Sequence, residues 1–77
     1  MLQMNVAEGF DGIAIVIARR RKNMKAQDLA IAVGISSQKL SRMELGRATI
    51  PEQVAIAIAR ELGISIEVLR ITPEAKV

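Results

Sequence analysis

The side chains able to do chemistry in this 77-residue sequence are mainly arginine, lysine, serine, glutamine and the carboxylates. Histidine, cysteine and tyrosine are all absent. The sequence therefore lacks the usual general base, the commonest metal ligands and any means of forming a disulfide. No pair of carboxylates has a spacing suited to acid–base catalysis. We expect a protein that is not an enzyme, uses no cofactor or metal, and binds its partner through charge and hydrogen bonds.

The basic side chains are concentrated in one part of the chain. Residues 19–47 hold eight arginines and lysines but only two acidic residues, a net charge of +6. The rest of the chain carries −3, so the overall charge of +3 understates this segregation. Segregated positive charge is typical of proteins that bind a polyanion such as nucleic acid. The alternative is a solvated basic surface with no partner.

Inside the basic segment, residues 27–43 follow a pattern typical of two short helices joined by a tight turn. Five apolar residues would hold this pair against a core: Leu29, Val33, Ile35, Leu40 and Met43. Ala30 supplies a small side chain where the helices approach, and Gly34 supplies the glycine that the turn requires. The remaining polar residues fall on one outer face of the second helix: Ser37, Gln38, Lys39, Ser41 and Arg42.

Glycines, prolines and capping residues divide the chain into short helical segments. The expected helices cover about residues 12–22, 26–33, 37–45, 50–62 and 66–71. Ser36 and Ser65 are expected to cap the third and fifth helices at their N-termini. Thr49 and Glu52 have the spacing of a capping box, which predicts that they open the fourth helix.

These segments predict one domain. Residues 1–11 are expected to form a loose N-terminal arm, residues 12–71 the helical domain, and residues 72–77 a C-terminal tail. The apolar run at residues 13–18 is far shorter than the roughly 20 residues that cross a bilayer. It also precedes its positive cluster, the reverse of a secretory signal. We therefore expect a cytoplasmic protein without a membrane segment.

The sequence resembles the helix-turn-helix domain of the phage repressor/Cro (Xre) transcriptional regulators over about residues 12–71. The matching segments are Arg19, Leu29-Ala30, Val33-Gly34-Ile35-Ser36, Leu40-Ser41-Arg42-Met43-Glu44, Gly46, Ile58-Ala59 and Leu62-Gly63-Ile64-Ser65-Ile66. A lone helix-turn-helix segment is a weak signal, but the same segment within its five-helix frame is specific. The resemblance implies an all-α, five-helix, lambda-repressor-like DNA-binding domain whose third helix, about residues 36–45, enters the major groove.

The resemblance also implies which residues touch DNA. Carried over by position, the candidates for base contact are Ser37, Gln38, Ser41 and Arg42. The candidates for phosphate contact are Lys25, Gln27, Lys39 and Arg47. The family commonly begins its second helix with a Ser or Thr cap followed by glutamine. Here Lys25 and Ala26 take those two positions and Gln27 comes one residue late, so Lys25 is expected to act as a point charge.

Arg19 and Glu44 match a pair that ties the first helix to the third in this family. Their implied role is structural, and the alternative is two exposed charges that never meet. Arg20 and Arg21 follow Arg19 directly, and consecutive helical residues point in different directions. We interpret Arg20 and Arg21 as a solvated face, with long-range attraction to DNA as the alternative.

Some apolar residues exceed what the core of this family needs. The candidates for a dimer interface are Ile13, Val16 and Ile17 on the first helix and Ile66, Val68, Leu69 and Ile71 on the fifth. Contiguous exposed apolar surface usually marks an interface. The alternative is cover by the N-terminal arm through Leu2, Met4, Val6 and Phe10, and both arrangements can hold together.

The leading functional prediction is a small transcriptional regulator that binds double-stranded DNA at the nucleoid, as a homodimer on two-fold symmetric sites. The alternative is a protein-interaction module on the same fold, such as an antitoxin-like subunit or a coactivator bridge. The surplus apolar face of the first helix favours that alternative and leaves room for a protein partner there.

Overall fold

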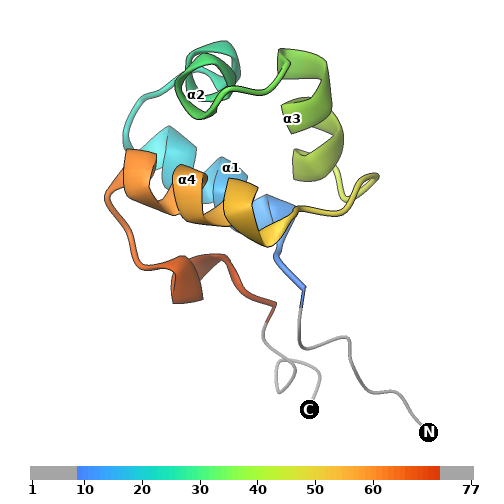
Figure 1. Cartoon of the computed structure of the whole chain (residues 1–77). Helices are drawn as coiled ribbons and strands as arrows, with labels where there is room; N and C mark the ends of the chain where they lie inside the picture. The colour runs from blue at the N-terminus through green and yellow to red at the C-terminus, as the bar shows by residue number, and fades with distance from the viewer. Residues whose placement is uncertain (1–8, 72–77) are drawn as a thin grey trace, which may run out of the picture.

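The computed structural model describes residues 9–71, which form four α-helices followed by one turn of 3₁₀ helix (Figure 1). The elements are α1 (Gly12–Arg21), α2 (Ala26–Val33), α3 (Ser37–Glu44), α4 (Glu52–Leu62) and the 3₁₀ helix η2 (Ile66–Leu69). This is the all-α class that the sequence predicts, with the fifth helix reduced to a short 3₁₀ turn. None of the helices in this range is long and apolar enough to cross a membrane.

Local signals set most of the helix boundaries. The Ser36 hydroxyl accepts a hydrogen bond from the backbone N–H of Lys39 at 3.0 Å, which confirms it as the cap of α3. Ser65 caps η2 in the same way through the N–H of Glu67, at 3.2 Å. Gly34 ends α2 with a φ of 79°, a left-handed conformation that glycine adopts without steric cost.

The core is aliphatic and draws on every element. Its fully buried large side chains are Ile15, Leu29, Leu40, Met43, Ile58, Leu62 and Leu69. They form one cluster, with α1 and α4 in the middle, α2 and α3 above them and η2 below (Figure 1). Since no polar or charged residue is buried in the described range, apolar burial is the main source of stability.

The start of α1 lies against the end of α3 without any intervening side chain. A Cβ added at Gly12 would lie 2.8 Å from the carbonyl oxygen of Glu44 and closer still to that of Met43. Only glycine allows this approach. Asp11, the residue before it, caps α1 by accepting the N–H of Ile13 at 3.0 Å.

The predicted capping box at the start of α4 is wrong. Pro51 is the N-terminal cap residue, the helix begins at Glu52, and no side chain caps it. A box that starts at Thr49 would place Ile50 in the first helical position. Because Ile50 precedes a proline, the helical conformation is disfavoured there, and the helix starts after the proline instead.

The two ends of the described chain pair with each other, which shortens both the expected arm and the expected fifth helix. The N–H of Asp11 donates to the carbonyl of Leu69 at 2.7 Å, and the N–H of Ile71 donates to that of Gly9 at 3.1 Å. Arg70 is extended, and its guanidinium lies 5.0 Å from the centroid of the Phe10 ring. Residues 9–11 are therefore fixed to the domain; Leu2, Met4 and Val6 lie outside the described residues.

Candidate nucleic-acid interface

The turn between α2 and α3 sets the position of the polar helix. After the left-handed Gly34, the N–H of Ile35 donates to the carbonyl of Ala30 at 3.0 Å, which closes the end of α2. Ala30 is itself buried. The chain then turns so that α3 runs steeply across α2 at one side of the molecule (Figure 1). The two helices thus meet as the spacing of residues 27–43 predicts.

One face of α3 is anchored and the opposite face is open. Leu40 and Met43 are completely buried and hold the helix on the core. The polar residues around them are all exposed: Ser37, Gln38, Lys39, Ser41 and Arg42. Among residues 9–71 none of these five side chains takes part in a salt bridge or in a hydrogen bond with another residue. Their hydrogen-bonding groups are therefore free for a partner.

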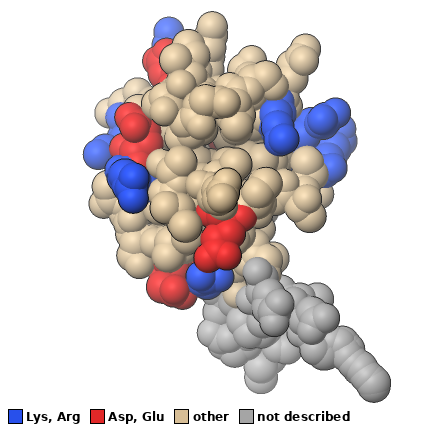
Figure 2. Space-filling view, in the orientation of Figure 1, with Lys and Arg blue, Asp and Glu red and all other residues tan. Residues whose placement is uncertain are grey.

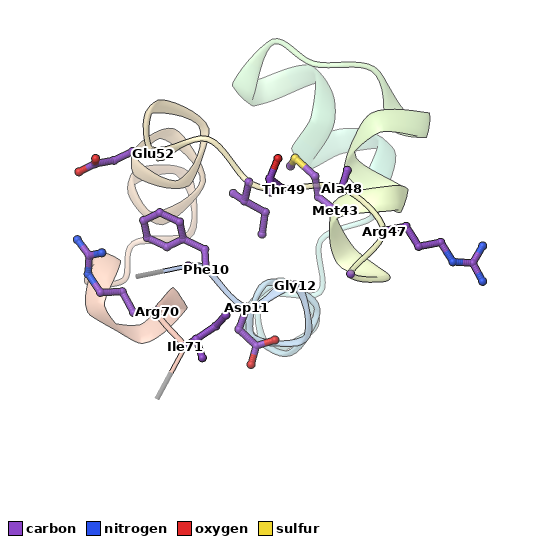
Figure 3. A pocket seen from close by; sticks show the side chains of 13 residues that line it. Phe10, Asp11, Gly12, Met43, Arg47, Ala48, Thr49, Glu52, Arg70 and Ile71 are labelled. Atoms are coloured by element: carbon purple, nitrogen blue, oxygen red, sulfur yellow. The ribbon is translucent and has the colours of Figure 1, made fainter. Parts of the chain in front are cut away.

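The C-terminal end of α3 brings a second arginine to this face. The N–H of Arg47 donates to the carbonyl of Arg42 at 2.8 Å, and that of Gly46 donates to Met43 at 3.2 Å. With Gly46 at a φ of 77°, these two bonds form a Schellman motif. The motif places Arg47 beside the last turn of α3, and its side chain extends away from the body of the protein (Figure 3).

A partly buried ion pair holds the end of α3 against α1. Nε of Arg19 donates to Oε2 of Glu44 at 2.9 Å, and Nη2 donates to Oε1 at 3.1 Å. Nη1 of Arg19 also donates to the carbonyl of Met24 at 3.0 Å. The two side chains are only 11% and 9% exposed. The single acidic residue of α3 is thereby neutralised, so the exposed charges of this helix are all positive.

Lys25 and Gln27 lie at the N-terminus of α2. Lys25 occupies the cap position without a side-chain cap bond, and both residues are exposed. Free backbone amides and the helix dipole favour an anion at such a terminus. Lysine and arginine side chains also gather beside α3, at the right of Figure 2, with no acidic side chain next to them in that view. The surface beside α3 is thus positively charged, whereas the first turn of α2 also carries the exposed acidic residue Asp28.

A helix-turn-helix family model matches residues 15–69, which extend from α1 to the end of η2. The chain belongs to this family, the Xre-like helix-turn-helix proteins. A comparison with curated proteins gives no match.

Solved structures support the same fold. Two crystal structures of the clp gene regulator ClgR from Corynebacterium glutamicum match this helix-turn-helix protein with a TM-score of 0.71 each. The first structure is 28% identical, and the match covers 73% of this chain and 60% of that chain. The second is 26% identical, and the match covers 84% of this chain and 83% of that chain. The solution structure of the P22 C2 repressor DNA-binding domain matches with a TM-score of 0.69 at 19% identity, over 87% and 82%.

This helix-turn-helix protein also carries an apolar surface on α1 and η2. Ile13, Ile17 and Val68 are 63%, 50% and 54% exposed. An open groove of about 430 Å³ runs beside them, lined by Ala14, Ile17, Ala18, Arg21, Lys22, Leu62, Ile64 and Val68. Ile17 lies about 160° around α1 from Arg19, which contacts α3. The groove therefore faces away from the polar face of α3.

The structure removes one residue from the predicted dimer interface. Leu69 is completely buried in the core, where it anchors η2, and cannot contact a second molecule. Ile66 and Val16 are partly buried, whereas Ile71 is exposed. Because η2 is a 3₁₀ turn, its side chains do not follow the α-helical arrangement that the sequence predicts, and Leu69 turns inward.

A second open groove of about 750 Å³ lies between the start of α1, the loop at residues 46–50 and the paired chain ends (Figure 3). Two of its polar side chains, Asp11 and Arg70, have structural partners. Asp11 caps α1, and Arg70 covers the Phe10 ring and donates to Glu67 at 3.2 Å. Arg47, Thr49 and Glu52 also line this groove, and none of the three takes part in a salt bridge among the described residues.

Leu45 is a residue of the α3 surface that sequence reasoning missed. It follows α3 directly as the C-terminal cap residue and is 63% exposed. Its apolar character alone gives no indication of the side to which it points. The signal was its helical position, opposite Leu40 and Met43 and in line with Gln38 and Ser41.

Proposed function

We propose that this protein is a sequence-specific DNA-binding transcription regulator that inserts α3 into the major groove. The observation that carries the proposal is the anchored α3, with Leu40 and Met43 buried and the side chains of Ser37, Gln38, Lys39, Ser41 and Arg42 exposed. The ClgR structures are described as those of a gene regulator, and the P22 structure as that of a DNA-binding domain. Such a protein would act at the nucleoid.

Each polar residue of this surface has a proposed role. Gln38 and Arg42 read base edges, because glutamine pairs bidentately with adenine and arginine with guanine. Ser37 and Ser41 contact bases from the same face. The proposed phosphate contacts are Lys25, Gln27, Lys39 and Arg47, all of them exposed. Lys39 lies in the first turn of α3, Arg47 follows its end, and Lys25 and Gln27 lie at the start of α2.

The test is selection of a binding site from random double-stranded DNA, followed by two substitutions. Arg42→Ala should weaken binding to the selected site by about 1–3 kcal/mol and affect random DNA little. Lys39→Ala should weaken both and reduce the slope of affinity against salt by about one. Equal effects of Arg42→Ala on both DNAs would contradict base reading by Arg42, and failure to enrich any site would contradict the function itself.

We further propose that the protein is a homodimer through the apolar surface of α1 and η2. Ile13, Ile17 and Val68 are its most exposed residues, and the proposed interface also includes Val16, Ile66 and Ile71. Exposed apolar surface of this kind usually marks an interface. Because the surface faces away from α3, pairing there leaves the polar face uncovered. A dimer on DNA would read two half-sites about 34–36 Å apart.

A second candidate function uses the same groove for a different protein. Arg21 and Lys22 stand at its rim, and among the described residues neither takes part in a salt bridge. An acidic segment with two or three aliphatic side chains would complement this apolar floor and basic rim. The protein would then act as an antitoxin-like subunit or a coactivator bridge. Purification as a monomer that binds DNA would favour this candidate over the homodimer.

A further inference from the structure

Leu45 extends the exposed face of α3 by one apolar residue. Its N–H donates to the carbonyl of Ser41 at 3.0 Å and its backbone is still helical, so its side chain follows the helix surface. At about 100° per residue it lies 40° around the axis from Ser41 and 60° from Arg42. It is therefore in the middle of the face that the buried Leu40 and Met43 leave open.

The charges around Leu45 restrict what can cover it. The Schellman motif brings Arg42 and Arg47, both exposed, to the same end of α3. Glu44, the neighbouring acid, is paired with Arg19 on the inner side. A second copy of the chain that docked here would bring four arginines together, which is unfavourable. A polyanion with an apolar group at its surface would neutralise the two arginines and bury the Leu45 side chain.

We propose that Leu45 recognises a thymine by packing against its 5-methyl group in the major groove. This inference rests on the proposed function, because it requires α3 to lie in that groove. Thymine is the one base of DNA that presents a methyl group there, and apolar side chains contact it. Leu45 lies about 6 Å further along the helix than Ser41, so it reads a base pair at the edge of the half-site.

The experiment replaces each thymine of the selected site in turn with deoxyuridine, which removes only the methyl group. For the unsubstituted protein, affinity should fall about fourfold at one position per half-site, the effect of burying one methyl group. Leu45→Ala should bind the thymine site about as weakly as the unsubstituted protein binds a site with deoxyuridine at that position in both half-sites. It should also show no further loss when that methyl group is removed.

Two controls separate the possible outcomes. Ile31→Ala truncates an equally exposed aliphatic residue on α2 and should keep the full deoxyuridine effect. Because Leu45 is exposed, the melting temperature of Leu45→Ala should stay unchanged. If no site is enriched, the proposed function fails. A selected site can bind with the expected dependence on Arg42 and yet contain no thymine whose methyl group contributes affinity only when Leu45 is present. In that case the proposed function stands and this inference is overturned.

Discussion

At the scale of single residues, Arg19 and Glu44 do two things at once. Their two hydrogen bonds join α1 to the end of α3, and the bond from Arg19 to the carbonyl of Met24 adds the loop before α2. The pair also removes the acidic charge of α3 from the surface. We infer that positive charge near α3 depends on this inward pairing as well as on the number of basic residues.

Breaking the pair should destabilise the fold. Glu44→Ala leaves the Arg19 guanidinium nearly buried without its partner, which should cost about 3 kcal/mol. For a domain of this size the melting temperature should fall by more than about 10 °C, measured by circular dichroism. The matched control is Glu67→Ala, which breaks an exposed pair with Arg70 and should change the melting temperature little. Equal effects of the two substitutions would contradict a structural role for Arg19 and Glu44.

At the scale of elements, the close approach of α1 to α3 fixes how α3 lies on the core. Gly12 is buried against the last carbonyls of α3. The Schellman motif that follows then directs Gly46 and Arg47 away from the core. The same end of α3 is therefore tightly packed on one side and open to solvent on the other.

Gly12→Ala should separate these two helices. The added Cβ would overlap backbone carbonyls, which cannot move aside as a side chain can, and the cost should be about 3 kcal/mol or more. Chemical denaturation followed by circular dichroism measures this loss. Gly46→Ala is the control, since its Cβ would meet nothing within 4 Å and only its positive φ costs about 1–2 kcal/mol. A Gly12→Ala protein more stable than Gly46→Ala would show that the approach is not needed.

At the scale of the whole molecule, a small aliphatic core separates two different surfaces. One is the polar and basic face of α3, and the other is the apolar surface of α1 and η2. Since they point away from each other, the proposed DNA contact and the proposed contact with a second protein molecule do not exclude each other. This arrangement suits a short regulator, because each function uses its own side of one core.

The dimer prediction belongs to this scale. Sedimentation equilibrium at tens of micromolar should give twice the chain mass of 8.4 kDa. Ile17→Glu places a charge in the centre of the proposed interface and should give a monomer that still melts cooperatively. Ile31→Glu, on the exposed side of α2, should remain a dimer. A monomeric unsubstituted protein would contradict the homodimer and leave the protein-partner candidate.

Many features of the candidate interface were predictable because their causes are local. Ser36 caps α3 and Gly34 ends α2 through atoms only a few residues away. The local sequence pattern was therefore enough to predict both helix ends. Thr49 misled because its spacing fits a capping box, although Pro51 rules the box out. Leu45 was overlooked because an apolar residue does not by itself show whether it faces the core or the solvent.

The sequence by itself determined the all-α class, the positions of the helices in the chain and the polar face of α3, since caps, breakers and helical periodicity act over one or two turns. Only the tertiary structure decided that Gly12 meets the end of α3, that Phe10 pairs with Arg70, and that Leu69 turns inward. These features join residues more than 30 positions apart or depend on how such segments pack. Local sequence does not predict that packing, because the contacts form only when distant segments pack together in the core.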